Sequence, residues 1–274
     1  MIEIPESTTL ARQIAEAFSG KRITEVVAGK TPHGFAFFNH DKKTYPEMLC
    51  GKKLSEVNAN GGSVELVIED MHFVFNDGAT PHYLSPEEDV PAKHQFLVRF
   101  DDKSGFYCTV RMYGGMAIYP FGESDNFYYL VSKEKPSPLS SQFTRSYFQT
   151  IVDQASGKTS AKALLATEQR IPGLGNGVLQ DILFNAGIHP QRKLQDLEGA
   201  DIDTLFSCIT EILTDMTAQL GRDTEKDLYG TSGGYQTILS SKTRDKPCPV
   251  CGSSIVRKAY MGGNVYFCPV CQPL

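Results

Sequence analysis

The sequence has no run of 18 consecutive apolar residues, and its start is acidic and proline-containing rather than basic and then apolar. These absences argue against a membrane span and against a secretory signal peptide, so we expect a soluble cytoplasmic protein. An excess of basic charge is also missing, because 27 Lys and Arg residues stand against 32 Asp and Glu residues, a net charge of −5. This balance excludes a uniformly basic coat for nucleic acid but still allows a local basic face.

Internal repeats and low-complexity tracts are likewise missing from the 274 residues, and 41% of the residues are hydrophobic. A buried core is therefore expected, and wholesale disorder is excluded. The length suits one large domain or two ordinary ones.

The first half of the chain has the pattern of a leading helix followed by β-structure. Pro5 and Glu6 favour a helix start, apolar residues recur at helical spacing as far as Phe18, and Gly20 ends the helix. Short strand-like runs follow, separated by turn signals: Arg22–Val27, Phe35–Phe38, Ser63–Ile68, Phe73–Phe75, Phe96–Phe100, Tyr107–Met112 and Ala117–Tyr119. So many short strands predict a β-sandwich or barrel.

The second half changes to helical periodicity after a Pro- and Ser-rich segment that begins at Pro136. Apolar residues lie three and four apart in four segments: Phe143–Gln154, Ala161–Thr167, Gly177–Ala186 and Ile202–Leu220. Gly221 caps the last helix, and a loop rich in Gly, Thr and charge follows. We therefore predict three domains, at residues 1–135, 136–240 and 241–274.

Seven cysteines, an odd number, do not suggest a disulfide framework. Cys50, Cys108 and Cys208 stand singly in apolar surroundings and are expected to be buried thiols. The other four form two C-P-V-C pairs that flank two short strands: Cys248, Cys251, Cys268 and Cys271. This spacing predicts one structural Zn²⁺ on a β-hairpin, with an iron–sulfur cluster as the alternative.

The cysteine module also carries a local excess of basic charge. Residues 241–274 contain five Lys and Arg residues and one Asp, a balance of +4. Such a group is either a solvated face or, on a hairpin with so little core, a contact for the DNA backbone.

A glycine-rich turn, Ile171–Gly177, joins two of the predicted helices. Its backbone N–H groups at a helix N-terminus can approach a phosphate, and Asn176 can bind a phosphate oxygen. The alternative is an ordinary turn between helices in which Asn176 caps the next helix.

As a whole, the chain resembles the formamidopyrimidine-DNA glycosylase and endonuclease VIII family. Four features carry the resemblance: the opening Met1–Glu6, the segment Ile171–Pro190, the loop Gly230–Gln236 and the four-cysteine module. The resemblance implies an α+β fold of two lobes, in which an N-terminal helix and β-sandwich precede a helix–two-turn–helix domain with a C-terminal four-cysteine zinc β-hairpin. It also implies a monomer that binds damaged or unpaired DNA in the cleft between the lobes, with the damaged nucleotide flipped out.

The family implies a set of DNA-binding positions in the second lobe. Asn176 matches a phosphate-binding residue, whereas Asn264 stands where the family has an arginine at the tip of the finger. The full set expected to contact DNA is Gly173, Gly175, Asn176, Tyr235, Arg257, Lys258 and Asn264.

The nucleophile of the family is an N-terminal proline, and Ile2 occupies that position here. Isoleucine disfavours removal of Met1, so a retained Met1 would move the free amine by about 3.8 Å along the chain. Its primary amine can still attack a sugar carbon. Glu3 matches the acid beside the nucleophile, and Glu6 matches an acid at the helix start. Both carboxylates can instead simply complement the helix dipole.

Other family groups are absent from the expected positions. The family's β-hairpin lysine is missing from the matching segment Val57–Ser63. The methionine that fills the place of the flipped base is missing from Phe75–Gly78. An Arg-Phe pair of the family is replaced by Tyr113-Gly114. We therefore expect a DNA-repair protein that is a base-excision DNA glycosylase with altered mechanism and lesion range, with a doubtful abasic-site lyase activity. It would be cytoplasmic and nucleoid-associated. The alternatives are a catalytically inactive lesion- or structure-specific DNA-binding protein, and a nuclease or RNA-directed protein on the same scaffold.

Overall fold

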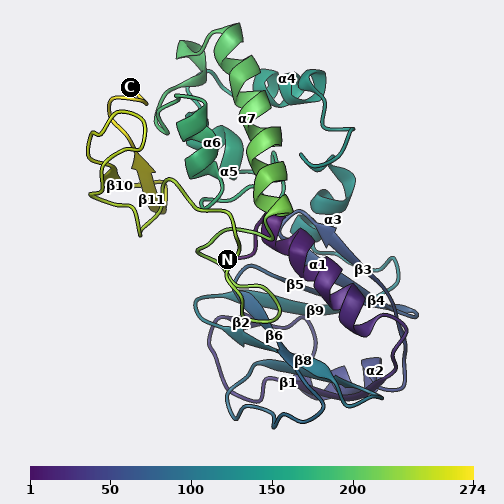
Figure 1. Ribbon diagram of the computed structural model, residues 1–274. Coiled ribbons are helices and arrows are strands. Elements are labelled where there is room, and N and C mark those ends of the chain that lie inside the picture. The colour runs from purple at the N-terminus through teal and green to yellow at the C-terminus, as the bar shows by residue number, and fades with distance from the viewer.

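The computed structural model describes residues 1–274 and consists of two lobes joined at a narrow junction, with a small hairpin module attached to the second lobe (Figure 1). The first lobe contains a leading helix, short helical segments and two β-sheets, and the second lobe is helical. The predicted α+β fold of two lobes is confirmed. None of the helices is both long and apolar enough to cross a bilayer.

Two packed sheets form the β-sandwich of the first lobe. The five-stranded sheet has the order β2 (Ala36–Phe37), β9 (Gly114–Pro120), β5 (Met71–Asn76), β4 (Ser63–Ile68) and β3 (Leu54–Asn60). The four-stranded sheet has the order β1 (Ile23–Ala28), β7 (Phe96–Phe100), β8 (Gly105–Val110) and β6 (Ala79–Leu84). All neighbours pair antiparallel except β2 and β9, which are parallel.

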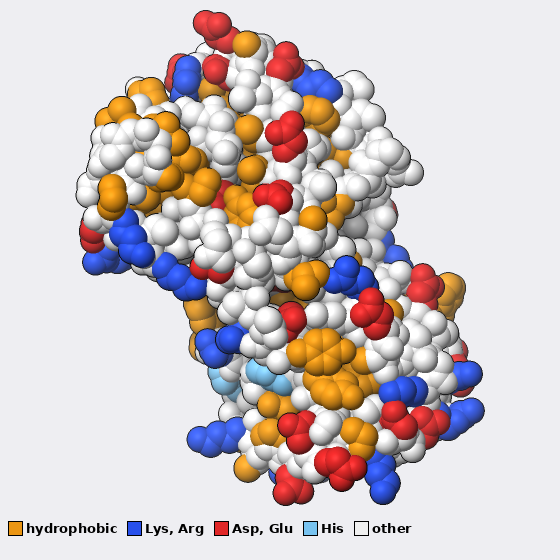
Figure 2. All heavy atoms as spheres, in the orientation of Figure 1, with side chains coloured by type: hydrophobic (Ala, Val, Ile, Leu, Met, Phe, Trp, Pro, Cys, Tyr) orange, Lys and Arg blue, Asp and Glu red, His pale blue; other side chains and the backbone are white.

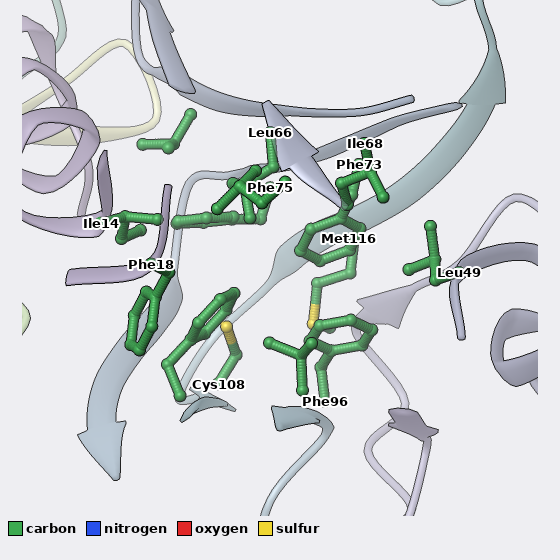
Figure 3. Packing of buried hydrophobic residues seen from close by; sticks show 14 of the residues in the cluster. Ile14, Phe18, Leu49, Leu66, Ile68, Phe73, Phe75, Phe96, Cys108 and Met116 are labelled. Carbon is green, nitrogen blue, oxygen red and sulfur yellow. The ribbon is translucent and has the colours of Figure 1, made fainter. Parts of the chain in front are cut away.

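The buried core of the sandwich combines aromatic and aliphatic side chains. Figure 3 shows its side chains packed between the sheets, where the rings of Phe73 and Phe96 stack with centroids 4.3 Å apart. The helix α1 (Ile4–Phe18) covers one side and inserts Ile14 and Phe18 into this core. The apolar positions that predicted the leading helix are thus the ones that it buries.

The second lobe packs four helices around a separate core: α4 (Arg145–Gln154), α5 (Ala161–Ala166), α6 (Leu179–Asn185) and α7 (Gly199–Ala218). A short 3-10 helix, η2 (Leu194–Asp196), precedes α7. The side chain of Ile4 belongs to this second core, although it is the first residue of α1. The start of α1 therefore packs against both lobes.

The C-terminal module is a hairpin of β10 (Val256–Tyr260) and β11 (Gly263–Phe267), as expected. Its small core includes Cys248, Ile255 and Cys268 and continues onto Phe184 of α6. The hairpin therefore has few buried residues of its own.

Several short elements were not predicted. They are β3, β6, α2 (Tyr45–Leu49), α3 (Phe127–Glu134) and the two 3-10 helices, η1 (Lys42–Thr44) and η2. Pro81 argues against a strand in the sequence of β6, but β6 tolerates a proline because it is an edge strand. The predicted helix at Gly177 begins only at Leu179, and Cys50 is half-buried rather than buried. Both predicted domain boundaries fall in connections between elements, and the division itself stays a prediction.

Candidate functional site at the junction of the lobes

The first four residues lie between the lobes and are held by backbone hydrogen bonds to each. The Ile2 N–H donates to the Asp77 carbonyl at 2.8 Å in the first lobe, and the Ile4 N–H donates to the Gly173 carbonyl at 3.1 Å in the second. The N-terminus is therefore a fixed part of the junction rather than a free tail.

The Glu3 carboxylate lies at the N-terminal end of α6. One oxygen accepts the Gly177 N–H at 2.8 Å and the other accepts the Val178 N–H at 2.8 Å. A helix N-terminus binds an anion through free N–H groups and its dipole, and here the anion is this buried side chain. The prediction that these N–H groups cradle a phosphate is therefore wrong in this structure.

Arg222 lies on the other side of the two acids and is almost completely buried. Its Nε and one terminal nitrogen donate to the two oxygens of Glu6 at 2.9 and 2.8 Å, and its other terminal nitrogen lies 3.6 Å from Glu3. The backbone N–H of Arg222 also donates to Glu6, at 3.2 Å. Such a bidentate, charge-assisted pair fixes the loop after α7 against the start of α1.

The two carboxylates differ in their electrostatics. Burial raises the pKa of Glu3, and this effect outweighs the Arg222 charge and the two N–H groups that lower it. Burial also acts to raise the pKa of Glu6, but the charge and hydrogen bonds of Arg222 outweigh it and hold the pKa below its usual value. Glu6 is therefore held as an anion, whereas the environment of Glu3 shifts this carboxyl group toward its protonated form.

The α-amino group belongs to Met1, and it is partly exposed. Its nitrogen lies 2.6 Å from the Glu225 carboxylate, and the Met1 carbonyl accepts from Arg222 at 3.4 Å. Ile2, the position of the family nucleophile, has its side chain buried and its N–H bonded to Asp77. The junction thus presents the amine of Met1, and the side chain of Lys226 lies beside it.

A cavity of about 30 Å³ adjoins this amine and is lined in part by Met1, Asp77 and Glu225. This volume is about that of one water molecule.

The glycines of the turn before α6 serve packing between the lobes. A Cβ on Gly173 would lie 2.3 Å from the backbone of Gly61 in the turn between β3 and β4, and one on Gly175 would lie 2.7 Å from the Glu3 carboxylate. Gly61 and Gly173 both have positive φ, +57° and +78°. These contacts give Gly173 and Gly175 a packing role, and their contact with DNA stays a prediction.

Asn176 joins the helical lobe to the hairpin module. Its Nδ2 donates to the Asn264 carbonyl at 3.0 Å, and Gln180 donates to the same oxygen at 3.2 Å. Its Oδ1 is buried without a partner. The helix cap of α6 is Val178, so the alternative that Asn176 caps the helix is also wrong.

The remaining predicted DNA-binding residues separate into an exposed group and one buried residue. Arg257 and Lys258 lie exposed on β10, where Arg257 donates to the Asn264 side chain at 3.0 Å and Lys258 donates to Gln191 at 2.7 Å. Tyr235 is only 6% exposed and packs in the helical core, and its contact with DNA stays a prediction.

The ligand atoms of the four cysteines all lie within 4.8 Å of one another. The Cys248 and Cys271 sulfurs are 3.8 Å apart, and those of Cys251 and Cys268 are 3.4 Å apart. Zinc–sulfur bonds of about 2.3 Å in a tetrahedron place sulfurs about 3.8 Å apart, so the four thiols fit one Zn²⁺.

Sequence reasoning missed Arg222 and Glu225, which lie in the loop after α7. Two buried carboxylates require a cation, but the sequence offers no spacing that selects Arg222 from 27 basic residues. It also missed Arg111, which is exposed two residues before Tyr113, so a cation and an aromatic ring are both present on that turn.

Basic side chains gather at the lower edge of the hairpin module, beside the waist between the lobes (Figure 2). The facing surface of the first lobe carries both signs of charge and apolar side chains. The distribution matches the local basic face that the sequence allows.

Comparisons with known proteins agree with this arrangement. Residues 135–226 match the model of the formamidopyrimidine-DNA glycosylase H2TH domain. The chain is 26% identical to a formamidopyrimidine-DNA glycosylase of Bacillus cereus over 279 residues, covering 100% of this chain and 99% of the relative. It is 29% identical to one from Symbiobacterium thermophilum over 284 residues, covering 100% and 90%.

Solved structures share the fold. The MutM (Fpg) protein of Thermus thermophilus superposes with a TM-score of 0.81 at 22% identity, covering 98% of each chain. The Lactococcus lactis Fpg in complex with DNA containing N7-benzyl-Fapy-dG superposes with a TM-score of 0.86 at 22% identity, covering 99% of this chain and 100% of the other.

Proposed function

Because the chain belongs to the formamidopyrimidine-DNA glycosylase and endonuclease VIII family, we propose that it binds damaged DNA and cleaves the N-glycosyl bond of a damaged nucleotide. The support is the match over the whole chain to relatives named as formamidopyrimidine-DNA glycosylases and the fold shared with Fpg–DNA complexes. DNA as substrate would place the protein at the nucleoid.

The observation that carries the proposal is the Glu3 carboxylate, held by Gly177 and Val178 at the junction of the lobes. A carboxylate with a raised pKa can activate water or stabilise positive charge at the sugar as the bond to the base breaks. In this route water adds to the anomeric carbon, the base leaves with the bonding electrons and takes up a proton, and an abasic site remains.

The second route uses the Met1 amine. The nitrogen attacks the anomeric carbon, the C–N bond to the base breaks, and loss of the amine proton with opening of the sugar gives a Schiff base. Glu225 lies 2.6 Å from this nitrogen and can accept the proton. Elimination at the phosphate would then cleave the strand.

The four-cysteine cluster is proposed to hold one structural Zn²⁺. Its four thiolates leave no open position for a substrate, so the metal would stabilise the hairpin rather than take part in the reaction. The hairpin in turn positions Asn264 against Asn176.

Borohydride reduction separates the two routes. Lesion-bearing duplex is incubated with the protein and borohydride, and the covalent product is digested and sequenced by mass spectrometry. The amine route gives an adduct on the peptide that begins at Met1, whereas the water route gives no adduct and abasic sites that alkali cleaves. In the water route Glu3→Gln should lower the excision rate at least about 100-fold, and Glu16→Gln, an exposed acid on the same helix, should not change it.

The second candidate function is binding of damaged DNA without excision. The observation that favours it is the pairing of both carboxylates with Arg222, which leaves neither acid free in this structure. Tight binding to one lesion, with no excision by the wild-type protein from any lesion, would establish this function instead.

A further inference from the structure

We propose that the edge of the five-stranded sheet beside the N-terminus is a stacking surface for unpaired DNA bases, made by Phe35, Phe37, Met112 and Tyr113. This inference deepens the proposed function, on which it rests. It assigns the substrate class as single-stranded or locally unpaired DNA.

Two exposed aromatic rings lie at β2. Phe35 directly precedes the strand and Phe37 is its last residue, one on each side of Ala36. Their side chains are 62% and 56% exposed, whereas Ala36 between them packs against the sandwich core. Because β2 is an edge strand of only two residues, nothing in the fold covers these rings.

The surface continues onto the turn between β8 and β9. The Gly114 N–H donates to the Phe35 carbonyl at 3.0 Å, and the parallel pairing of Ala36 with Gly114 places Phe35 opposite Tyr113. Met112, next to Tyr113, is 66% exposed. Phe35 and Tyr113 are therefore brought together from two segments far apart in sequence, and the exposed Phe37 and Met112 flank them along the chain.

This surface adjoins the candidate site. The Tyr113 hydroxyl lies 3.9 Å from the sulfur of Met1, and the Tyr113 carbonyl accepts the Gly78 N–H at 3.0 Å. A strand whose bases stack on these rings would thus run past the amine of Met1.

The local charge favours a polyanion over a second protein chain. Residues 29–40 and 105–122 contain no Asp or Glu, although the whole chain has 32, and they carry Lys30 and Arg111. Both of these cations are exposed. The acids whose charges reach Tyr113 are the half-buried Asp77 and the buried Glu3. Exposed aromatic rings together with exposed cations are the composition by which single strands are bound independently of sequence.

The test compares the wild-type protein with Phe35→Ala, Phe37→Ala and the double variant. Phe127→Ala is the control, since Phe127 is 63% exposed on the first turn of α3 outside the surface. The probes are a single-stranded oligonucleotide containing 2-aminopurine, a duplex with a central unpaired bubble, and a fully paired duplex. The chain has no tryptophan, so the emission of the probe is observed with little protein background.

We expect stacking to quench 2-aminopurine in the wild-type complex and each Phe→Ala change to weaken single-strand and bubble binding by about tenfold. Binding of the paired duplex and base excision from a damaged duplex should change less than twofold. The proposal is overturned if the double variant binds all three probes like the wild-type protein, or loses affinity for all three equally. Either result leaves the proposed excision untouched, because excision is measured separately.

Discussion

The Arg222 side chain forms a bidentate ion pair with Glu6, with nitrogen–oxygen distances of 2.9 and 2.8 Å, between two segments 216 residues apart in sequence. This pair holds the loop after α7 to the start of α1. The Glu3 carboxylate, which accepts two N–H groups at the start of α6, holds the N-terminus to the second lobe. The first six residues thus join both lobes through charges that are taken out of water, and breaking one of these pairs should be costly.

Replacing Arg222 with methionine should lower the free energy of unfolding by about 3 kcal/mol, because two buried carboxylates lose their cation. Chemical denaturation at neutral pH measures this change. Arg12→Met is the control, since Arg12 forms an exposed pair with Glu16 on the surface of α1 and should cost less than about 1 kcal/mol. Equal effects of the two changes would show that the Arg222 network does not hold the junction.

The contribution of Glu6 should depend on pH in one direction. The pKa of Glu6 is lower in the folded protein than in the unfolded chain, so its stabilisation is complete above the unfolded pKa of about 4.3. It is lost as the pH falls through the folded pKa. The difference in unfolding free energy between wild type and Glu6→Gln should therefore be largest near pH 7 and shrink below about pH 4. A difference that stays constant from pH 7 to pH 3 would contradict this assignment.

Removal of zinc should unfold the hairpin module while leaving both lobes folded. A chelator, or the change Cys248→Ser, is expected to release one Zn²⁺ per chain and to abolish protection of the β10 and β11 amides from hydrogen exchange. Cys50→Ser should retain the metal, because Cys50 lies in the first lobe. If the chelated protein keeps its β11 protection, the metal has no structural role.

Leu228 should anchor the loop after α7 to the first lobe. Its side chain is fully buried in the sandwich core, and its N–H donates to Gln13 of α1 at 3.1 Å. Leu228→Ala should cost about 3 kcal/mol and expose the loop 222–236 to limited proteolysis. Leu274→Ala, at a side chain that is 79% exposed, should do neither. An uncut loop in the Leu228 variant would mean that other contacts hold it.

The sequence predicted the parts of the fold that depend on local pattern. Helical spacing in α1, the strand density of the first lobe and the paired cysteines each have a physical cause within a few residues. The interlocking of Gly61 with Gly173 does not, since it depends on how the lobes meet. For the same reason the sequence suggested a phosphate cradle at Gly177, where the structure places the Glu3 carboxylate.

The central claim is excision of a damaged base at the Glu3 site, and a single assay tests it. The substrates are oligonucleotides that carry an oxidised purine, an oxidised pyrimidine, an abasic site or a cross-link, each as duplex and as single strand. Each substrate is incubated with the wild-type protein, Glu3→Gln or Glu16→Gln, and strand cleavage is analysed with and without alkali. The account predicts release of at least one damaged base by wild type and by Glu16→Gln, and at least about 100-fold slower release by Glu3→Gln. Unchanged release by Glu3→Gln, or no release by wild type from any substrate, would contradict it.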